Sequence, residues 1–485
     1  MLFTNMELNP NNSRPFDVHR WSEYPEVKAL TKEILYELFV KFPNKHTEHK
    51  REKALRVLLI DLWCSLKEDP FQYIGIQLSS NAYQNGERYN KLHLKYGPIR
   101  ECFEALARAG YLAGYPGFYD HKTGIGRVTR IISTTKLRQR LLKAKWSDNL
   151  KLERVDDEVI ILKGKDDKKI IDYVDNKITK RMRDDVERYN RFIADVQLDV
   201  SIQDKEIPEN IYLHRKSLYR VFNNGKFTQG GRFYGGWYQG YERWIRERIT
   251  LDNKETVEID FRGLHIILAY AMVGIDFHAS TGEDDPYLIK EFEYCEVDAH
   301  KYRNLIKTTF LITLNAKSIN SAVKAVFSKW QSNKDDSSVE KTEYPDHVTH
   351  DQIKQLMGWI KNKHQPIARL FNSGVGLDMQ FLDSEIANRV LMKMVDEKRP
   401  VLPIHDSFVC KKQDEKRLKE IMIESLHEQL NAMKLKSVDV KLKHVPFFER
   451  RDSSKDLDVN EMNPNRMHFL AFRREIGYLA DTKKS

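Results

Sequence analysis

The sequence predicts a mixed α+β protein with several domains. Residues 52–67 place apolar side chains at helical spacing, and residues 96–111 repeat that pattern between a Gly-Pro start and Gly110. Two runs with strand propensity, residues 256–260 and 399–412, are separated by further helical segments. With 485 residues, of which 41% are hydrophobic, the chain can bury a large core and should form two to four domains at roughly 100–200 residues each.

Composition and charge exclude several classes of protein. Only 22 Gly and 15 Pro argue against a disordered or collagen-like chain, and the apolar stretches are far shorter than the roughly 20 residues of a membrane span. The N-terminus lacks a basic segment followed by an apolar run, so we expect a cytoplasmic protein without a membrane partner. The four cysteines form no CxxC pair, which argues against a zinc site. The 81 Lys and Arg residues against 71 Asp and Glu, a net charge of +10, mildly favour a polyanionic partner such as nucleic acid.

A helix followed by two extended pieces marks the N-terminal part. The helix at 96–111 leads into residues 112–119 and 126–133, which are joined by the polar turn DHKTG. This pattern resembles a winged-helix domain, in which one helix enters a DNA groove while the wing contacts the backbone. We therefore predict an N-terminal extension at 1–49 and a winged-helix DNA-binding domain at 50–145.

Basic residues of this domain are the candidate DNA contacts. Arg127 and Arg130 lie on the second wing strand and are predicted to bind nucleic acid through its phosphates. Further phosphate partners are predicted in the basic segment that follows: Lys136, Arg138, Arg140, Lys143 and Lys145. The alternative is a helical domain with a solvated basic face.

The middle of the chain is predicted to connect two functional parts. Residues 146–226 are highly charged and should form a connecting, thumb-like helical region. Two elements are expected within it: a hairpin at 152–164 and a helix at 168–196. Residues 227–450 form the second domain, in which the polar stretch 331–347 is a surface insertion, and residues 451–485 are a C-terminal tail.

Two aspartates are predicted to end neighbouring strands. Asp406 lies at the tip of a hairpin formed by 399–412, and Asp260 ends the strand 256–260 just before a helix begins. Carboxylates on adjacent strand ends can bind two Mg²⁺ ions, which stabilise the attacking and leaving oxygens of in-line phosphoryl transfer. Glu258 is assigned to the opposite face of its strand and left out of the site.

Between the two aspartates lies a predicted helix, residues 298–317, with a stripe of side chains every four positions. The stripe consists of Arg303, Lys307, Leu311 and Asn315. Arg and Lys one turn apart can hold the phosphates of a nucleoside triphosphate, while the later positions face its sugar and base. A solvated basic turn is the alternative, but the position of the stripe between two strand-end carboxylates favours nucleotide binding.

These three elements, in this order, resemble the family A DNA polymerases and the related single-subunit RNA polymerases over residues 227–443. The matching residues are Asp260, Phe261, Leu264 and Leu268 for the first palm motif, Arg303 and Lys307 for the fingers helix, and His405 with Asp406 for the palm hairpin. Two smaller matches are TQGGRF at 228–233, which includes Arg232, and the helix at 379–391, which carries Gln380.

The resemblance implies a right-hand polymerase with palm, fingers and thumb that uses two Mg²⁺ ions. It implies that Asp260 and Asp406 bind the metals, and Lys307 is a catalytic candidate because it could protonate the leaving pyrophosphate. Nucleotide contacts are implied for Arg303, Lys307, Leu311, Asn315 and His265, and primer-template contacts for Arg232, Gln380 and His405. The expected partners are a DNA primer-template, nucleoside triphosphates and replication accessory proteins.

Several positions depart from the family pattern. Asn315-Ala316 stands in place of the usual Tyr-Gly, and Ser407 follows the metal aspartate as in the RNA polymerases. His265 stands where the DNA polymerases carry a Glu that blocks a ribose 2′-OH, and we expect its size to favour deoxynucleotides. The sequence before the palm does not carry a second acidic cluster of the kind that would suggest a proofreading exonuclease.

The sequence therefore predicts a template-dependent nucleotidyltransferase, most simply a DNA polymerase or primase-polymerase of a plasmid, phage or other mobile element. Two alternatives stay open. One is a non-catalytic DNA-binding replication initiator or regulator with a decayed polymerase domain, and the other is an RNA-synthesising primase. The intact set of carboxylates and cations favours an enzyme, whereas Asn315-Ala316 favours decay or altered chemistry.

Overall fold

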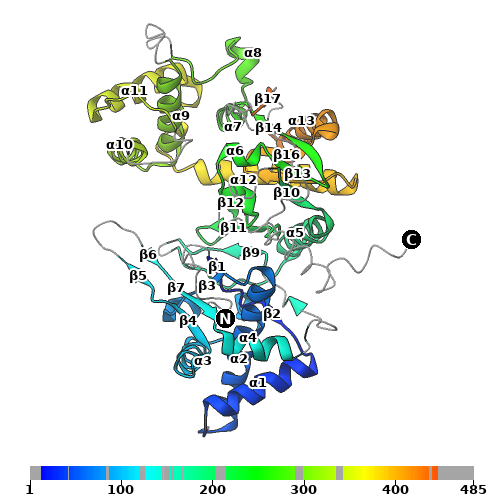
Figure 1. Cartoon of the computed structure of the whole chain (residues 1–485). Coiled ribbons are helices and arrows are strands. Elements are labelled where there is room, and N and C mark those ends of the chain that lie inside the picture. Colours follow the sequence, from blue (N-terminus) through cyan, green and yellow to red (C-terminus); the bar gives the residue numbers. More distant parts are fainter. Residues whose placement is uncertain are drawn as a thin grey trace.

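Helices and sheets alternate through the computed structural model (Figure 1), so the predicted α+β class is confirmed. The structure describes residues 13–41, 43–83, 87–119, 126–144, 146, 153–154, 158–165, 168–201, 215–289, 299–334, 342–435, 438 and 440–445. No helix within these ranges combines the length and the apolar character needed to cross a lipid bilayer.

The N-terminal module is built on a four-stranded sheet with the order β1-β3-β7-β4. Its strands are β1 (Ser13–Pro15), β3 (Tyr73–Ile76), β4 (Leu112–Tyr115) and β7 (Thr129–Ser133). Four helices accompany it: α1 (Pro25–Leu38), α2 (Lys45–Glu68), α3 (Tyr96–Arg108) and α4 (Thr135–Lys143). Their apolar faces share one core, which contains the fully buried Leu58, Ile99 and Leu137. The two helices and two extended pieces predicted from the sequence are present.

The described part of the predicted extension 1–49 belongs to this module. Strand β1 pairs in parallel with β3, and Val27 of α1 is fully buried in the module core. A buried ion cluster secures the arrangement, since Arg14 donates to Asp61 at 2.9 Å and Arg20 Nη1 lies 3.3 Å from the same carboxylate. This segment is therefore continuous with the core of the module.

A second, six-stranded sheet carries the C-terminal part, with the order β10-β13-β14-β16-β15 and with β17 paired to β14. Its strands are β10 (Leu198–Val200), β13 (Ile249–Leu251), β14 (Lys254–Phe261), β15 (Val401–Ile404), β16 (Ser407–Lys411) and β17 (Leu442–His444). The predicted hairpin with Asp406 in its turn is formed by β15 and β16.

The hairpin expected at 152–164 is wrong. Strand β8 (Glu153–Arg154) pairs with β2 (Arg20–Trp21), whereas β9 (Ile160–Leu162) runs parallel to β11 (Tyr219–Asn223). Strand β11 also pairs with β12 (Lys226–Tyr234), which completes a three-stranded sheet. Both segments do form strands, as their local sequence predicts. Each strand pairs with a partner that is distant in the chain, and this partner is not visible in the local sequence.

The C-terminal part contains nine further helices in the described residues. They are α5 (Lys177–Asp195), α6 (Arg243–Arg246), α7 (Leu264–Met272), α8 (Phe277–Thr281), α9 (Ala299–Asn315), α10 (Ile319–Lys334), α11 (His350–Lys363), α12 (Gly376–Asp396) and α13 (Glu415–Ala432). Part of the predicted insertion 331–347 is helical, because α10 extends to Lys334; residues 335–341 lie outside the described ranges.

Helix α12 crosses β12 closely at Gly231. A Cβ at this position would lie 2.7 Å from the ring of Phe222 and 2.8 Å from Ser384 Oγ, and its φ of +82° disfavours other residues. Arg220 ties the crossing together by donating to the Gly231 carbonyl at 2.7 Å and to Ser384 Oγ at 2.9 Å. The glycines of TQGGRF therefore allow the helix to approach the strand that carries Arg232.

Candidate active site

Two aspartates meet at the ends of paired strands. Strand β14 runs antiparallel to β16, and Asp260 pairs with Ser407. Asp406 belongs to the two-residue connection between β15 and β16, and its carbonyl oxygen lies 3.5 Å from the Phe261 amide, which donates to it. The structure therefore brings the two aspartates of the sequence prediction together.

The environment of Asp260 is that of a buried acid beside a like charge. Burial and then the charge of Asp406 raise the pKa of Asp260 to about 6, while Lys443 and Lys307 oppose the rise. Lys443 lies on β17, and its Nζ is 3.0 Å from Asp260 Oδ2. A divalent cation between the carboxylates would remove their repulsion.

The available donor groups suit Mg²⁺, which needs few protein ligands, better than a metal that is bound by protein side chains alone. No group of three or more His, Cys, Asp and Glu side chains is arranged to hold a metal in the described part of the chain. Mg²⁺ is commonly bound by one or two carboxylates, with water and substrate phosphates completing its shell. Asp260 and Asp406 fit that pattern, because the Asp260 side chain keeps 18% of its surface exposed.

Glu258 is a residue that the sequence interpretation assigned to the wrong strand face. Side chains alternate along a strand, so residues 258 and 260 share a face. Ser407 donates its hydroxyl to Glu258 Oε1 at 2.6 Å, and Arg246 donates to Oε2 at 3.2 Å. Glu258 therefore fixes the residue that follows Asp406, and correct use of the period of two would have identified it.

The two cations of the α9 stripe have different surroundings. Arg303 donates Nε to Asp285 Oδ2 at 2.5 Å, and its guanidinium lies 5.3 Å from the centre of the Tyr287 ring. Lys307 is exposed, and its positive charge favours the ionised form of Asp260. Arg303 is thus already paired, whereas Lys307 is available to an incoming anion.

The later positions of the stripe lie where α9 meets α12. Leu311 packs against the main core, and Asn315 donates its Nδ2 to the Leu311 carbonyl at 2.9 Å. A Cβ at Gly376, the first residue of α12, would lie 1.8 Å from Asn315 Oδ1. The helix therefore begins in direct contact with this amide, and the sugar and base contacts of Leu311 and Asn315 stay predictions.

A buried polar cluster lies beside the hairpin turn. Arg232 donates Nε and Nη2 to Asp383 Oδ2 at 2.9 and 2.6 Å, and its Nη2 is 3.2 Å from His265 Nε2. Burial would raise the pKa of Asp383, but Arg232 and His265 outweigh it and hold that pKa below its ordinary value. Asp383, which the sequence interpretation missed, therefore fixes two predicted site residues.

The turn residue His405 has an unusual backbone conformation. Its φ of 59° is in the left-handed region, which residues other than glycine seldom adopt and which is enriched at functional sites. Burial and then the charge of Arg232 lower the pKa of His405, so its imidazole is neutral at pH 7. Gln380 is half-buried on α12, and its predicted primer contact stays a prediction.

A run of three acidic residues ties one loop to three different elements, and the sequence interpretation did not use it. The pairs are Glu283 with Lys363 at the end of α11, Asp284 with Lys441 before β17, and Asp285 with Arg303 on α9. The run EDDP was visible in the sequence as consecutive acids before a proline. Its partners are distant in the chain, so only the fold reveals them.

His364 anchors the same loop from the other side. Its Nε2 lies 3.0 Å from the Pro286 carbonyl oxygen, and its Nδ1 lies 3.1 Å from the Tyr270 hydroxyl. Burial, followed by the charge of Lys363, lowers the pKa of His364 to about 4. The imidazole is therefore neutral at pH 7 and belongs to the support of the site.

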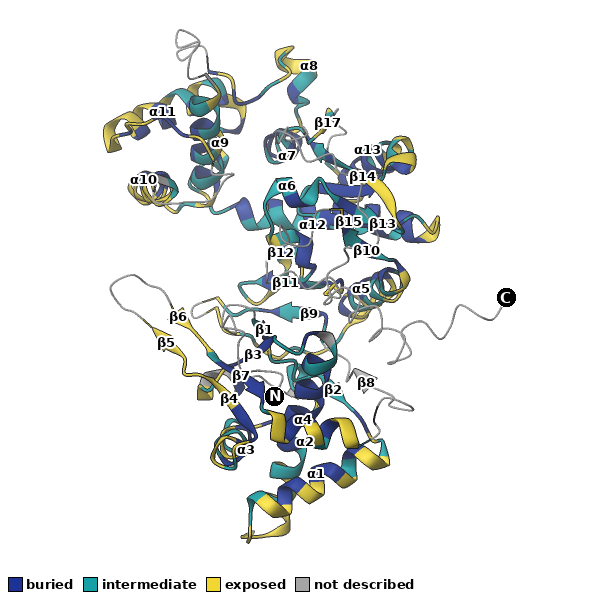
Figure 2. Ribbon diagram, viewed as in Figure 1, coloured by how far each residue is buried: buried dark blue, intermediate teal, exposed yellow. Residues whose placement is uncertain are grey.

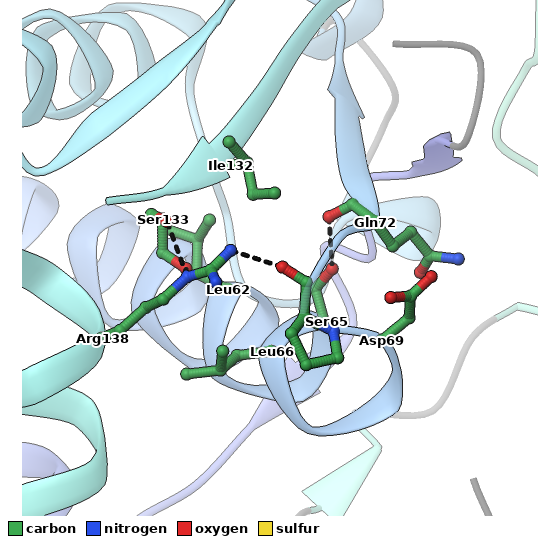
Figure 3. Close-up of a pocket in the computed structure, with 9 residues that line it drawn as sticks. Leu62, Ser65, Leu66, Asp69, Gln72, Ile132, Ser133 and Arg138 are labelled. Atoms are coloured by element: carbon green, nitrogen blue, oxygen red, sulfur yellow. Dashed lines mark hydrogen bonds between the residues drawn. The ribbon is translucent and has the colours of Figure 1, made fainter. Parts of the chain in front are cut away.

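The predicted DNA contacts of the N-terminal module separate into exposed and buried groups. Arg127 is exposed, whereas Arg130 is 8% exposed and lies 5.6 Å from the Tyr115 ring centre. Arg138 is also buried, in a small pocket beside α2, where it donates to the carbonyls of Ser133 and Pro70 (Figure 3). Direct phosphate contact by Arg130 or Arg138 is therefore corrected to a structural role.

Comparisons with known proteins give little beyond this geometry. No protein-family model and no curated protein sequence matches the chain. A solved structure that it resembles is the POL domain of Pol1 from M. smegmatis, in complex with DNA primer-template and dNTP. The TM-score is 0.32 at 11% sequence identity, and the match covers 55% of this chain and 51% of that one. The chain thus spans about half the length of that structure.

His364 should make the fold sensitive to acid. Its folded pKa is below the ordinary value of 6.5, so between pH 6.5 and 4 the unfolded chain binds more protons and stability falls as pH falls. His364→Phe should reduce the loss of unfolding free energy between pH 7 and 4.5 by about 2–3 kcal/mol, measured by urea denaturation. His347→Gln, which removes an exposed histidine, should keep the wild-type loss. Identical pH profiles for wild type and His364→Phe would refute the role of His364.

Proposed function

We propose that this protein is a template-dependent nucleotidyltransferase, most simply a DNA polymerase with a right-hand palm, fingers and thumb. The observation that carries the proposal is the juxtaposition of Asp260 and Asp406 at paired strand ends, with Lys307 of the cationic helix α9 acting on Asp260. The α+β fold and the order of the elements agree with it. An origin in a plasmid, phage or other mobile element is proposed from the architecture alone.

The residues present would divide the work of phosphoryl transfer. Asp260 and Asp406 would hold Mg²⁺, which supplies charge stabilisation for the attacking and leaving oxygens. Lys307 is exposed and unpaired among the described residues, so it can bind the outgoing phosphates and donate a proton to them. Arg303 can contact the same phosphates once Asp285 releases it. Glu258 and Asp383 are positioning residues in this scheme.

We also infer that residues 50–145 form a winged-helix module that binds DNA. The order of the elements α2, β3, α3, β4 and β7 supports this assignment, as does the ribbon of β5 (Phe118–Tyr119) and β6 (Gly126–Arg127) that extends from the sheet. Exposed cations such as Arg127 would contact the phosphates.

Loss of either aspartate should abolish primer extension. Asp260→Asn or Asp406→Asn should lower Mg²⁺-dependent extension of a labelled primer-template at least about 10²-fold, the scale expected when a charge-stabilising group is removed. Glu255→Gln changes an exposed acid of the same strand and should leave extension intact. Asp260→Asn should also keep or raise the melting temperature, since it relieves a buried repulsion. Undiminished extension by both variants would overturn the assignment.

His265 should govern the choice of sugar. It is the second residue of α7, in the helix that follows the strand of Asp260, and it contacts Arg232, so we expect its ring to fill the space of a ribose 2′-OH and to favour deoxynucleotides moderately. His265→Ala should raise the ratio of rNTP to dNTP incorporation in single-nucleotide extension. Arg232 keeps its bonds to Asp383 in this variant, so the link between β12 and α12 is retained. A wild-type preference for rNTPs would instead favour an RNA-synthesising primase.

Exposure should decide which wing arginine binds DNA. Arg127→Ala should weaken duplex binding by the full chain and reduce the salt slope, d log K/d log[salt], by about 0.9 for one lost phosphate contact. Arg130→Ala should instead lower the melting temperature of the protein, because Arg130 is buried against Tyr115. A larger change of the salt slope in Arg130→Ala than in Arg127→Ala would contradict this division. If wild type binds no duplex, the DNA-binding proposal fails.

A further inference from the structure

A two-stranded ribbon extends the sheet of the N-terminal module and carries large exposed rings. Phe118 pairs with Arg127, and Tyr119 pairs with Gly126. Phe118 is 53% exposed and Tyr119 is 61% exposed, and the ribbon projects from the module in Figure 1 and is coloured as exposed in Figure 2. Two neighbouring rings that are each more than half exposed mark a candidate interaction site.

The two rings stand on opposite faces of the ribbon. Consecutive residues of a strand alternate between faces, and Phe118 and Tyr119 are consecutive. Opposite Tyr119, a Cβ at Gly126 would lie 2.6 Å from the ring, so the tyrosine ring covers the glycine. On the other face, Phe118 has the exposed Arg127 as its partner in the register.

The base of the ribbon is tightly built. A Cβ at Gly117 would lie 2.8 Å from the Arg127 carbonyl oxygen, and the Gly117 amide donates to Thr129 Oγ1 at 3.1 Å. Tyr115 lies below, with its ring centre 5.7 Å from that of the buried Tyr73. The rings are thus presented on a supported element.

Charge and shape favour nucleic acid over a protein as the occupant. Within the described residues of 96–144, five cations are exposed against one exposed acid, Glu101; the cations are Arg100, Arg108, Arg127, Lys136 and Lys143. One flat protein surface could cover only one face of so thin a ribbon, whereas unpaired bases are small flat partners that can stack on either face. Bases inside a duplex are already stacked and offer no free face, so the match is to single-stranded nucleotides.

We propose that the β5–β6 ribbon is a stacking site for unpaired bases next to the duplex that the rest of the module binds. Phe118 and Tyr119 would each take a base, and Arg127 would hold the adjoining phosphate. The inference rests on the proposed DNA-binding function of residues 50–145. It adds that the preferred ligand is a junction between duplex and single strand, as found at a primer end.

The test compares the full-length protein on three labelled probes: a blunt duplex, the same duplex with a single-stranded overhang, and an oligothymidylate. Replacing both rings (Phe118→Ala with Tyr119→Ala) should weaken binding of the overhang probe about ten- to a hundredfold and leave the blunt duplex within about twofold. Tyr36→Ala, which removes another exposed ring on α1, is the matched control and should change neither. The melting temperature should stay the same in all variants.

The possible failures can be told apart. No binding of any probe by wild type would overturn the DNA-binding proposal and this inference with it. Strong duplex binding with no effect of the ring substitutions on the overhang probe would overturn only the inference. Equal losses on blunt and overhang probes would make the ribbon a duplex contact. Self-association of wild type that the ring substitutions abolish, without any change in DNA binding, would make it a protein interface. Each of the last two results also overturns the inference.

Discussion

Two like charges held together by a sheet constrain the whole C-terminal part. Pairing of β14 with β16 and the short connection between β15 and β16 leave Asp260 and Asp406 no freedom to separate. Burial of Asp260, and then the charge of Asp406, raise the pKa of Asp260 to about 6. Nearby cations therefore help to keep Asp260 ionised. Lys443 does so directly, and Lys307 does so through its field.

Most cations around this centre are already paired within the described part of the chain. The pairs are Arg232 with Asp383, Arg303 with Asp285, Lys443 with Asp260, Lys441 with Asp284 and Lys363 with Glu283. In the proposed function, a triphosphate would bind Lys307 directly and these paired cations by exchange of partners. Exchange is least costly where a pair is exposed and most costly where it is buried, so Lys441 can exchange readily and Arg232 should stay with Asp383. Arg232 then serves the site by joining β12 to Asp383 of α12 and to His265 of α7.

The sequence predicted local secondary-structure elements and side chains that recur at a fixed spacing along a helix. The strand ending in Asp260, the hairpin turn with Asp406 and the α9 stripe were predicted because each depends on a few neighbouring residues. Partners distant in the chain were not predicted. The pairing of β8 and β9 with separate strands and the role of Asp383 follow from tertiary packing, which leaves no local signal. Glu258 was missed because it was assigned to the wrong face of its strand. The alternation of side chains along a strand would have placed it on the same face as Asp260.

Burial also explains why a count of basic residues overestimates the number of side chains that can contact DNA. Arg130 and Arg138 increase the positive charge of the module, yet both are buried. An arginine is a long amphipathic side chain, and its guanidinium can satisfy several carbonyls inside a protein as well as a phosphate outside it. The charge of a sequence therefore indicates the class of partner, whereas the exposure of each side chain decides which residues can contact that partner.

The module with the ribbon is joined to the rest of the chain by a partly buried polar network. Arg88 donates to Glu158 at 2.9 Å and to Asp175 at 3.1 Å, and its guanidinium lies 4.1 Å from the Tyr173 ring centre. Glu158 also accepts from Arg183 of α5 at 3.0 Å, and its side chain is only 4% exposed. Salt screens such a network weakly. The orientation of the module relative to α5 therefore depends on specific contacts, so a nucleic acid held by the ribbon as proposed would keep a fixed orientation relative to α5.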